Sequence, residues 1–244
     1  MILAIDIGNT SAKYAIMDEK GEILLFDHLS GNWKDAIAGL LEKFGKDSIE
    51  KACISNVAGL QLELEGALSK NGIESFWLTW DSEIAKRWLK NIPEGYGADR
   101  VAADIGAVAA CPDRPLLVVD AGTCITYDVI SKEHVCLGGS ITPGIGLRLR
   151  AMHEHTAALP LFKPEGFAPV IGTNNEESMR GGCVNGVRWE IEGFARELST
   201  QVPGLRLYYT GGVPLVFAPE IEQFAVHDSY LVLRGLWHAY RDVK

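Results

Sequence analysis

The chain has 244 residues, with 23 lysines and arginines against 32 aspartates and glutamates, so its formal net charge at pH 7 is −9. That balance excludes a general nucleic-acid or anionic-membrane surface, because both need clustered positive charge. No apolar run approaches the roughly 18–20 residues of a membrane span. The opening Met1–Asp6 has no basic leader, and the five cysteines contain no CxxC pair. We therefore expect a cytoplasmic protein with neither a membrane nor a nucleic acid as partner.

The first half of the sequence opens with an apolar run that ends in Asp6 and an alternating run at Ala12–Met17, and then changes to helical spacing. The apolar residues of Trp33–Phe44 recur every three or four positions, which predicts an amphipathic helix. The strands expected in this half are Ile2–Asp6, Ala12–Met17, Glu22–Asp27, Lys51–Ser55 and Ser75–Thr79. The helices expected here are Trp33–Phe44, Leu60–Leu68 and the small-residue segment Ala98–Ala110.

The second half repeats this order of elements. The strands expected here are Leu116–Asp120, Cys124–Ile130, His134–Leu137 and Leu205–Thr210, with helices at Glu176–Leu198 and Leu231–Tyr240. Each half thus runs from three turn-linked strands into alternating helices and strands, which predicts an α/β layered architecture. Two prolines in Cys111–Pro115 end one helix before the second copy begins. We therefore expect two domains, 1–112 and 113–244, each near the common domain size.

A tight turn follows the first strand of each half, and its composition suits phosphate binding. Glycine permits a close backbone approach by a ligand. Successive N–H groups and the hydroxyls of Thr10, Ser11 and Thr123 can hold phosphate oxygens, and the aspartate at the strand end can hold a cation. One such turn is explained equally well as a hairpin whose buried aspartate accepts turn amides. Two copies at equivalent places favour a phosphate clamp in a cleft between the halves.

These turns carry a resemblance to a known superfamily. Asp6–Thr10 and Asp120–Thr123 resemble the two phosphate motifs of the acetate and sugar kinase, Hsp70 and actin (ASKHA) superfamily, and 210–212 resembles its adenosine motif. The resemblance implies a duplicated ribonuclease H-like, actin-like ATPase fold, with two βββαβα-type halves around a nucleotide cleft. With Gly97–Arg100 and Leu137–Gly144 added, the chain is similar nearly end to end to the type III pantothenate kinases. These enzymes phosphorylate the 4′-hydroxyl of pantothenate in the first step of coenzyme A synthesis.

The resemblance implies a role for each motif residue. It implies ATP as phosphoryl donor, Mg²⁺ with the nucleotide, and potassium or ammonium as a monovalent cation. It places Asp6, Ile7, Gly8, Asn9, Thr10, Ser11, Ala12, Lys13 and Thr123 at ATP, Gly97, Ala98, Asp99 and Arg100 at pantothenate, and the monovalent cation at Asp120. In it, Asp99 is the base that deprotonates the alcohol, and Arg100 beside it can pair with the pantothenate carboxylate.

Spacing alone gives plainer readings of the same residues. It favours Asp99 as an N-cap of the following helix, and it allows Arg100 a surface ion pair worth less than about 1 kcal/mol. Lys13 alternates with buried neighbours, so a phosphate contact and an exposed strand lysine are equally good interpretations.

Two positions depart from the family pattern. Lys90 stands where relatives carry a substrate-contacting tyrosine, while Tyr96 adjoins the Gly-x-Asp-Arg loop. Asn175 stands where they carry a threonine that contacts pantothenate across a homodimer interface, so the resemblance also implies a homodimer. The alternatives to a pantothenate kinase are another small-molecule kinase of the superfamily and a non-catalytic nucleotide-binding regulator. Asp99 distinguishes a kinase from a non-catalytic regulator, because a regulator needs no catalytic base.

Overall fold

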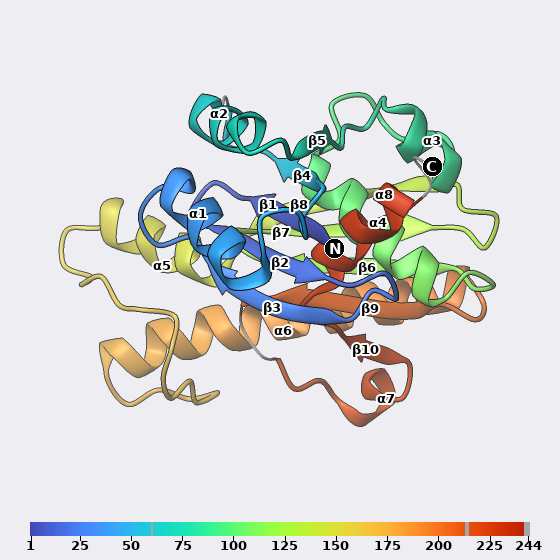
Figure 1. Ribbon diagram of the computed structural model, residues 1–244. Coiled ribbons are helices and arrows are strands. Elements are labelled where there is room, and N and C mark those ends of the chain that lie inside the picture. Colours follow the sequence, from blue (N-terminus) through green and yellow to red (C-terminus); the bar gives the residue numbers. More distant parts are fainter. Residues whose placement is uncertain (60, 213–214, 242–244) are drawn as a thin grey trace. The chain divides into compact units, whose positions relative to one another are not determined.

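The chain divides into two units by its internal packing, in a computed structural model that describes residues 1–59, 61–212 and 215–241 (Figure 1). Unit 1 contains Met1–Asp113, Ile130–Leu137 and the segment that begins at Tyr230. Unit 2 contains Arg114–Val129 and Gly138–Ser229. The chain therefore passes between the units more than once, and its last described helix belongs to the same unit as its first strand.

The sheet of unit 1 has the strand order β3-β2-β1-β4-β5. Its strands are β1 (Ile2–Ile7), β2 (Ala12–Met17), β3 (Ile23–His28), β4 (Lys51–Asn56) and β5 (Glu74–Trp77). β1, β2 and β3 pair antiparallel, whereas β4 and β5 run parallel to β1. Every residue of β1 is buried, as expected for a central strand that is covered on both faces.

Helices cover both faces of this sheet. The helices of the unit are α1 (Trp33–Phe44), α2 (Leu62–Lys70), α3 (Glu83–Trp88), α4 (Ala98–Ala110) and α8 (Leu231–Arg241), of which α3 packs against α4 and α8. Leu3, Ile5 and Ile7 of β1 share one hydrophobic core with α1 and α2. α4 and α8 pack against each other and against β4, and α8 also contacts β1. Because side chains alternate along a strand, Asp6 points away from the core that holds Leu3, Ile5 and Ile7.

Glycines set the closeness of α4 and α8. A Cβ at Gly235 of α8 would overlap the carbonyl oxygen of Ala102, and a Cβ at Gly106 of α4 would lie 2.5 Å from the carbonyl oxygen of Leu231. The two helix backbones are therefore in direct contact, which only residues without a side chain allow.

The sheet of unit 2 has the order β10-β9-β6-β7-β8. Its strands are β6 (Leu116–Ala121), β7 (Cys124–Ile130), β8 (Cys136–Pro143), β9 (Arg206–Gly211) and β10 (Ala225–His227), and its helices are α5 (Ile145–Glu154), α6 (Asn175–Gln201) and α7 (Pro219–Glu222). Apolar residues of β6, β7 and β9 form one core with the inner face of α6, where Tyr127 stacks on Phe194 at 4.3 Å between ring centroids.

Both sheets order their strands in the same way, third, second, first, fourth and fifth in chain order, so the duplicated α/β fold expected from the sequence is confirmed. Several element bounds differ from expectation. The strand expected at His134–Leu137 is β8, which begins at Cys136 and continues to Pro143. The helix expected at Leu60–Leu68 is α2, which begins at Leu62, while residue 60 lies outside the described residues. The sequence did not indicate α3, α5, α7 or β10.

Packing explains why β8 continues past Leu137 to Pro143. Gly138 and Gly139 have the composition of a turn, yet a Cβ at Gly139 would overlap the carbonyl oxygen of Tyr127 on β7. Gly139 therefore marks a close approach between strands and not a chain reversal. Among the described helices, none is long and apolar enough to cross a bilayer.

Candidate active site

The first glycine turn, at residues 8–11, joins β1 to β2. The N–H of Gly8 donates to the carbonyl oxygen of Ser11 at 3.0 Å, which closes the turn. The side chains of Asn9, Thr10 and Ser11 are exposed at its tip. Their hydroxyl and amide groups and the turn backbone are chemically suited to phosphate oxygens.

Strand register places two partners beside Asp6. Lys13 on β2 and Ser55 on β4 are its direct neighbours across the sheet. The Asp6 carboxylate, which is 6% exposed, pairs with Lys13 Nζ at 3.2 Å and accepts a hydrogen bond from Ser55 Oγ at 3.1 Å. Lys13 is thus not simply an exposed strand lysine, because its ammonium group is held at the end of β1 next to the turn.

The Gly97–Arg100 segment begins α4. Its N-cap is Gly97, which makes no side-chain cap, and Asp99 lies within the first turn of the helix. The N-cap reading of Asp99 is therefore wrong. Asp99 Oδ1 accepts the N–H of Arg100 at 2.8 Å, and a Cβ on Gly97 would lie only 2.5 Å from that oxygen. The glycine leaves room for the carboxylate to lie across the start of the helix.

The surroundings of Asp99 disfavour the charged form of its carboxyl group. Burial raises the pKa of its carboxyl above the ordinary value, and the negative charge of Asp6 raises the pKa further, against the opposing effect of the Arg100 N–H group. That interaction also shows that Asp99 lies within electrostatic reach of the first glycine turn. A half-buried carboxylate with a raised pKa is chemically suited to accept a proton from an alcohol.

Tyr96 and Arg100 are stacked beside Asp99. The guanidinium carbon of Arg100 lies 3.9 Å from the centroid of the Tyr96 ring. The Tyr96 hydroxyl donates to Asp104 Oδ2 at 3.0 Å. Lys90, by contrast, is exposed, and its backbone bonds with His134 and Cys136.

The second glycine turn, at residues 122–123, joins β6 to β7 in unit 2. The N–H of Gly122 donates to the carbonyl oxygen of Cys124 at 3.1 Å. The N–H of Gly144, the N-cap of α5, donates to the carbonyl oxygen of Thr123 at 2.9 Å, and a Cβ on Gly144 would overlap the carbonyl oxygen of Gly122. Backbone contacts therefore fasten this turn to the start of α5, while the Thr123 side chain stays exposed.

Asp120 repeats the strand-end arrangement of Asp6. Its parallel neighbour on β9 is Thr210, as Ser55 is the neighbour of Asp6. Thr210 is 2% exposed, and its buried hydroxyl has no hydrogen-bond partner among the described residues. The next residue, Gly211, has φ +120°, and a Cβ there would overlap the carbonyl oxygen of Ala121. Residues 210–211 thus lie directly beside the second glycine turn.

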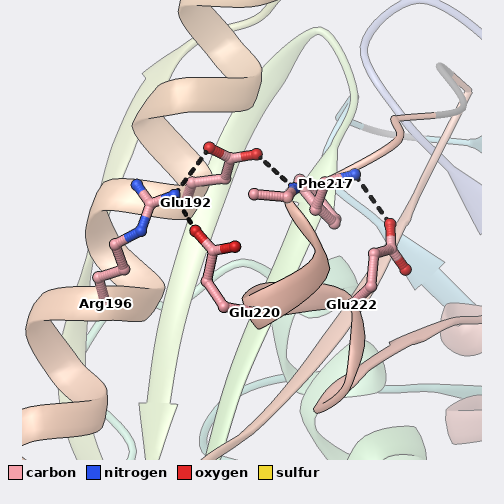
Figure 2. Close-up of polar contacts among 6 residues, drawn as sticks. Glu192, Arg196, Phe217, Glu220 and Glu222 are labelled. Atoms are coloured by element: carbon pink, nitrogen blue, oxygen red, sulfur yellow. Dashed lines mark hydrogen bonds and ion pairs between the residues drawn. The ribbon is translucent and has the colours of Figure 1, made fainter.

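A buried carboxylate fastens the segment that follows this motif (Figure 2). Glu192 of α6, which is 3% exposed, accepts the N–H of Ala218 at 2.8 Å and pairs with Arg196 at 3.3 Å. Arg196 also pairs with Glu220 at 2.8 Å, and the N–H of Phe217 donates to Glu222 Oε1 at 2.8 Å. The residues before and within α7 are therefore anchored to α6.

A second group of polar contacts centres on the carboxylate of Glu190 on α6. It accepts hydrogen bonds of 2.6 Å each from the Tyr127 hydroxyl, the Thr142 hydroxyl and the Arg148 guanidinium. These bonds lower the pKa of Glu190 although burial opposes them, and burial with the Glu190 charge raises the pKa of Tyr127. Arg148 also donates to the carbonyl oxygen of Pro143 at 2.7 Å. The cluster ties β7, β8, α5 and α6 together beside the Gly144 contact.

Sequence reasoning missed the two α6 carboxylates. The spacing of Glu192 and Arg196, four residues apart on a predicted helix, was a signal for one ion pair. No local signal links Glu190 to Tyr127 or Thr142, because those contacts depend on tertiary packing. Asn175, the departure noted on α6, is exposed at the first residue of that helix.

The repeated sheet, with an Asp-x-Gly turn at the same strand end of each copy, is the duplicated actin-like fold of the ASKHA class. Two solved structures share the fold. A conserved putative Baf family transcriptional activator from Campylobacter jejuni has a TM-score of 0.61 at 24% identity, covering 99% of this chain and 98% of that chain. A putative 2-dehydro-3-deoxygalactonokinase from Sinorhizobium meliloti has a TM-score of 0.60 at 15% identity, covering 100% and 99%.

Sequence comparison gives the particular family. The family model described as Type III pantothenate kinase matches residues 2–197. The Type III pantothenate kinase of Bacteroides fragilis (strain YCH46) is 34% identical over 237 residues, which are 97% of this chain and 96% of that protein. The chain belongs to the type III pantothenate kinase family.

Proposed function

We propose that the protein transfers the γ-phosphoryl group of ATP to the 4′-hydroxyl of pantothenate, forming 4′-phosphopantothenate in the first step of coenzyme A synthesis. The observation that carries the proposal is the Asp99–Arg100 pair at the start of α4. The Asp99 carboxylate, whose pKa is raised by burial, accepts the backbone N–H of Arg100, and the Arg100 charge acts on it with the opposite effect. An acceptor that has both an alcohol and a carboxylate needs one group of each kind.

In this mechanism Asp99 accepts the proton of the 4′-hydroxyl as the hydroxyl oxygen attacks the γ-phosphorus, and the bond from the γ-phosphorus to the β,γ-bridging oxygen breaks and releases ADP. Arg100 pairs with the pantothenate carboxylate and orients the acceptor. The turn amides and the exposed hydroxyls of Thr10, Ser11 and Thr123 donate to phosphate oxygens. Lys13, held at 3.2 Å from Asp6, adds positive charge near the first turn. Mg²⁺ bound with the nucleotide supplies further neutralisation of phosphate charge.

The monovalent cation belongs at Asp120 in this proposal. The Asp120 carboxylate and the buried hydroxyl of its neighbour Thr210, which has no hydrogen-bond partner in the described part of the chain, are hard oxygen donors of the kind that potassium takes. Among the described residues, no three His, Cys, Asp or Glu side chains gather as a metal-binding group. A single carboxylate fits a singly charged ion better than it fits a divalent one bound by protein ligands alone.

We also propose that the protein is a cytoplasmic homodimer. Unit 2 carries large apolar side chains that are well exposed: Phe167 at 74%, Val170 at 65%, Ile171 at 83% and Trp189 at 48%. A hollow of about 300 Å³ lies on α5 and α6, lined by Arg148, Met152, Ser178, Met179, Gly182 and Cys183. A second copy of the chain would remove this apolar surface from water.

The test is a direct assay with purified protein, ATP, Mg²⁺ and pantothenate, with and without K⁺, following 4′-phosphopantothenate by mass spectrometry. We expect product only with all substrates present, and faster turnover with K⁺ or NH₄⁺ than with Na⁺. No product under any condition would refute the kinase proposal. Equal rates in Na⁺ and K⁺ would refute the cation site alone, and a monomer mass by light scattering would refute the dimer alone.

A further inference from the structure

Tyr96 joins two residues that lie one helical turn apart on α4. Its ring lies under the Arg100 guanidinium, with 3.9 Å between the guanidinium carbon and the ring centroid. Its hydroxyl donates to Asp104 Oδ2 at 3.0 Å. Arg100 and Asp104 are four residues apart and therefore share one face of the helix. Tyr96 covers that face from the loop that precedes α4.

Burial and hydrogen bonds hold Tyr96 and Asp104 in place. Tyr96 is 6% exposed and Asp104 is fully buried, and the N–H of Tyr96 donates to the carbonyl oxygen of Pro93 at 3.2 Å. Arg100 is less buried than either. A solvated arginine side chain samples many rotamers, whereas a guanidinium held over a buried aromatic ring samples fewer. The ring is thus a fixed surface that limits the orientations of the Arg100 guanidinium.

We propose that Tyr96 is a positioning residue for the acceptor substrate. Its ring holds the Arg100 guanidinium in the orientation that pairs with the substrate carboxylate, and Asp104 holds the ring through its hydroxyl. The proposal rests on the function proposed above, because it takes the carboxylate of pantothenate as the partner of Arg100.

The geometry predicts which kinetic constant changes. Arg100 binds the acid end of the acceptor in the proposed mechanism, whereas Asp99 acts on its alcohol. Without the Tyr96 ring, Arg100 should bind the pantothenate carboxylate less well in the ground state and in the transition state alike. KM for pantothenate then rises while kcat stays nearly constant. Tyr96 contacts Arg100 and Asp104 of α4, so we expect KM for ATP to change much less than KM for pantothenate.

The first experiment compares two substitutions of the same residue. Tyr96→Leu removes the ring, and we expect KM for pantothenate to rise about 2- to 30-fold, the range for an exposed to a desolvated cation–π contact. Tyr96→Phe keeps the ring and removes the hydroxyl, and we expect it to recover most of the lost affinity while melting at a lower temperature. Tyr240→Leu is the stability control, because Tyr240 is a buried tyrosine of unit 1 on α8, and its KM should match the wild type.

The second experiment tests whether Tyr96 acts through Arg100. In a double-mutant cycle with Arg100→Ala, Tyr96→Leu should add almost nothing to the loss of kcat/KM for pantothenate already caused by Arg100→Ala. Additive losses, an equal rise in KM for ATP, or a KM rise in Tyr240→Leu as large as in Tyr96→Leu would each overturn the proposal. If the wild-type protein makes no phosphopantothenate, the proposed function fails instead, which is a different result.

Discussion

Replacing Gly106 with alanine tests the packing that holds α4, the helix whose first turn carries Asp99 and Arg100. The added Cβ would lie 2.5 Å from the carbonyl oxygen of Leu231 and 3.2 Å from the backbone nitrogen of Gly235. The first distance is roughly 0.9 Å below ordinary van der Waals contact. Both neighbours are backbone atoms, so no side chain can rotate away, and α8 must move.

The magnitude follows from two opposing effects. Overpacking a well-packed contact costs about 1–3 kcal/mol, and a clash between backbones belongs at the upper end. Alanine gains about 1 kcal/mol of helix propensity over glycine. The net loss in free energy of unfolding is therefore about 2 kcal/mol. Gly66→Ala is the matched control, because Gly66 lies in α2 with nothing within 4 Å of its added Cβ, and it should gain up to about 1 kcal/mol.

The assay is thermal unfolding of both variants beside the wild type. A difference of about 3 kcal/mol corresponds to melting temperatures about 6–12 °C apart for a chain of this size, with Gly66→Ala the higher. If Gly106→Ala melts at or above the wild type, the α4–α8 contact is not close-packed and the reasoning is wrong. Chemical denaturation gives the free energies directly.

Two further changes test the carboxylates. Asp99→Asn should lower kcat about 10²- to 10⁴-fold with nearly unchanged ATP binding, and near-normal turnover would place the base elsewhere. Folding raises the pKa of Asp99, so its contribution to stability is present at low pH and is lost as the pH rises through the folded-state pKa. Above that pH, Asp99→Asn should melt at the same temperature as the wild type or higher. Melting curves recorded across a range of pH check this. Glu192→Gln should destabilise the fold by about 1–3 kcal/mol, because it weakens a buried charged acceptor of the Ala218 N–H, and hydrogen exchange near 215–218 should rise. Glu220→Gln, at an exposed position, should change stability much less than Glu192→Gln, and equal losses in the two variants would contradict the importance of burial.

The sequence predicted those elements whose signal is local. The first glycine turn follows an apolar run that ends in Asp6, and the turn itself has a recognisable composition. Because that turn is a hairpin connection, Asp6 falls opposite Lys13, and their pairing follows from register. The missed contact with Ser55 depends on β4 pairing with β1 across 49 residues of sequence, for which the sequence has no marker.

The glycines of unit 2 show where composition misleads. Gly139 and Gly144 look like turn residues, but packing accounts for both: Gly139 lies against the carbonyl oxygen of Tyr127, and Gly144 lies against that of Gly122. A close approach and a chain reversal have the same residue preference, so α5 was hidden behind an apparent loop. The Tyr96–Arg100 stack was equally invisible, because four residues of spacing do not fix where a ring lies.

The position of α8 in the fold has a consequence for biosynthesis. Residues 231–241 are translated after all of unit 2, yet they cover β1, β4 and α4 in unit 1. While the ribosome makes unit 2, the N-terminal sheet and α4 therefore lack the apolar cover that α8 provides, which favours chaperone binding or aggregation at that stage. A nascent chain halted before residue 231 should keep a protease-sensitive α4, and release of the last helix should close the N-terminal core in one late step.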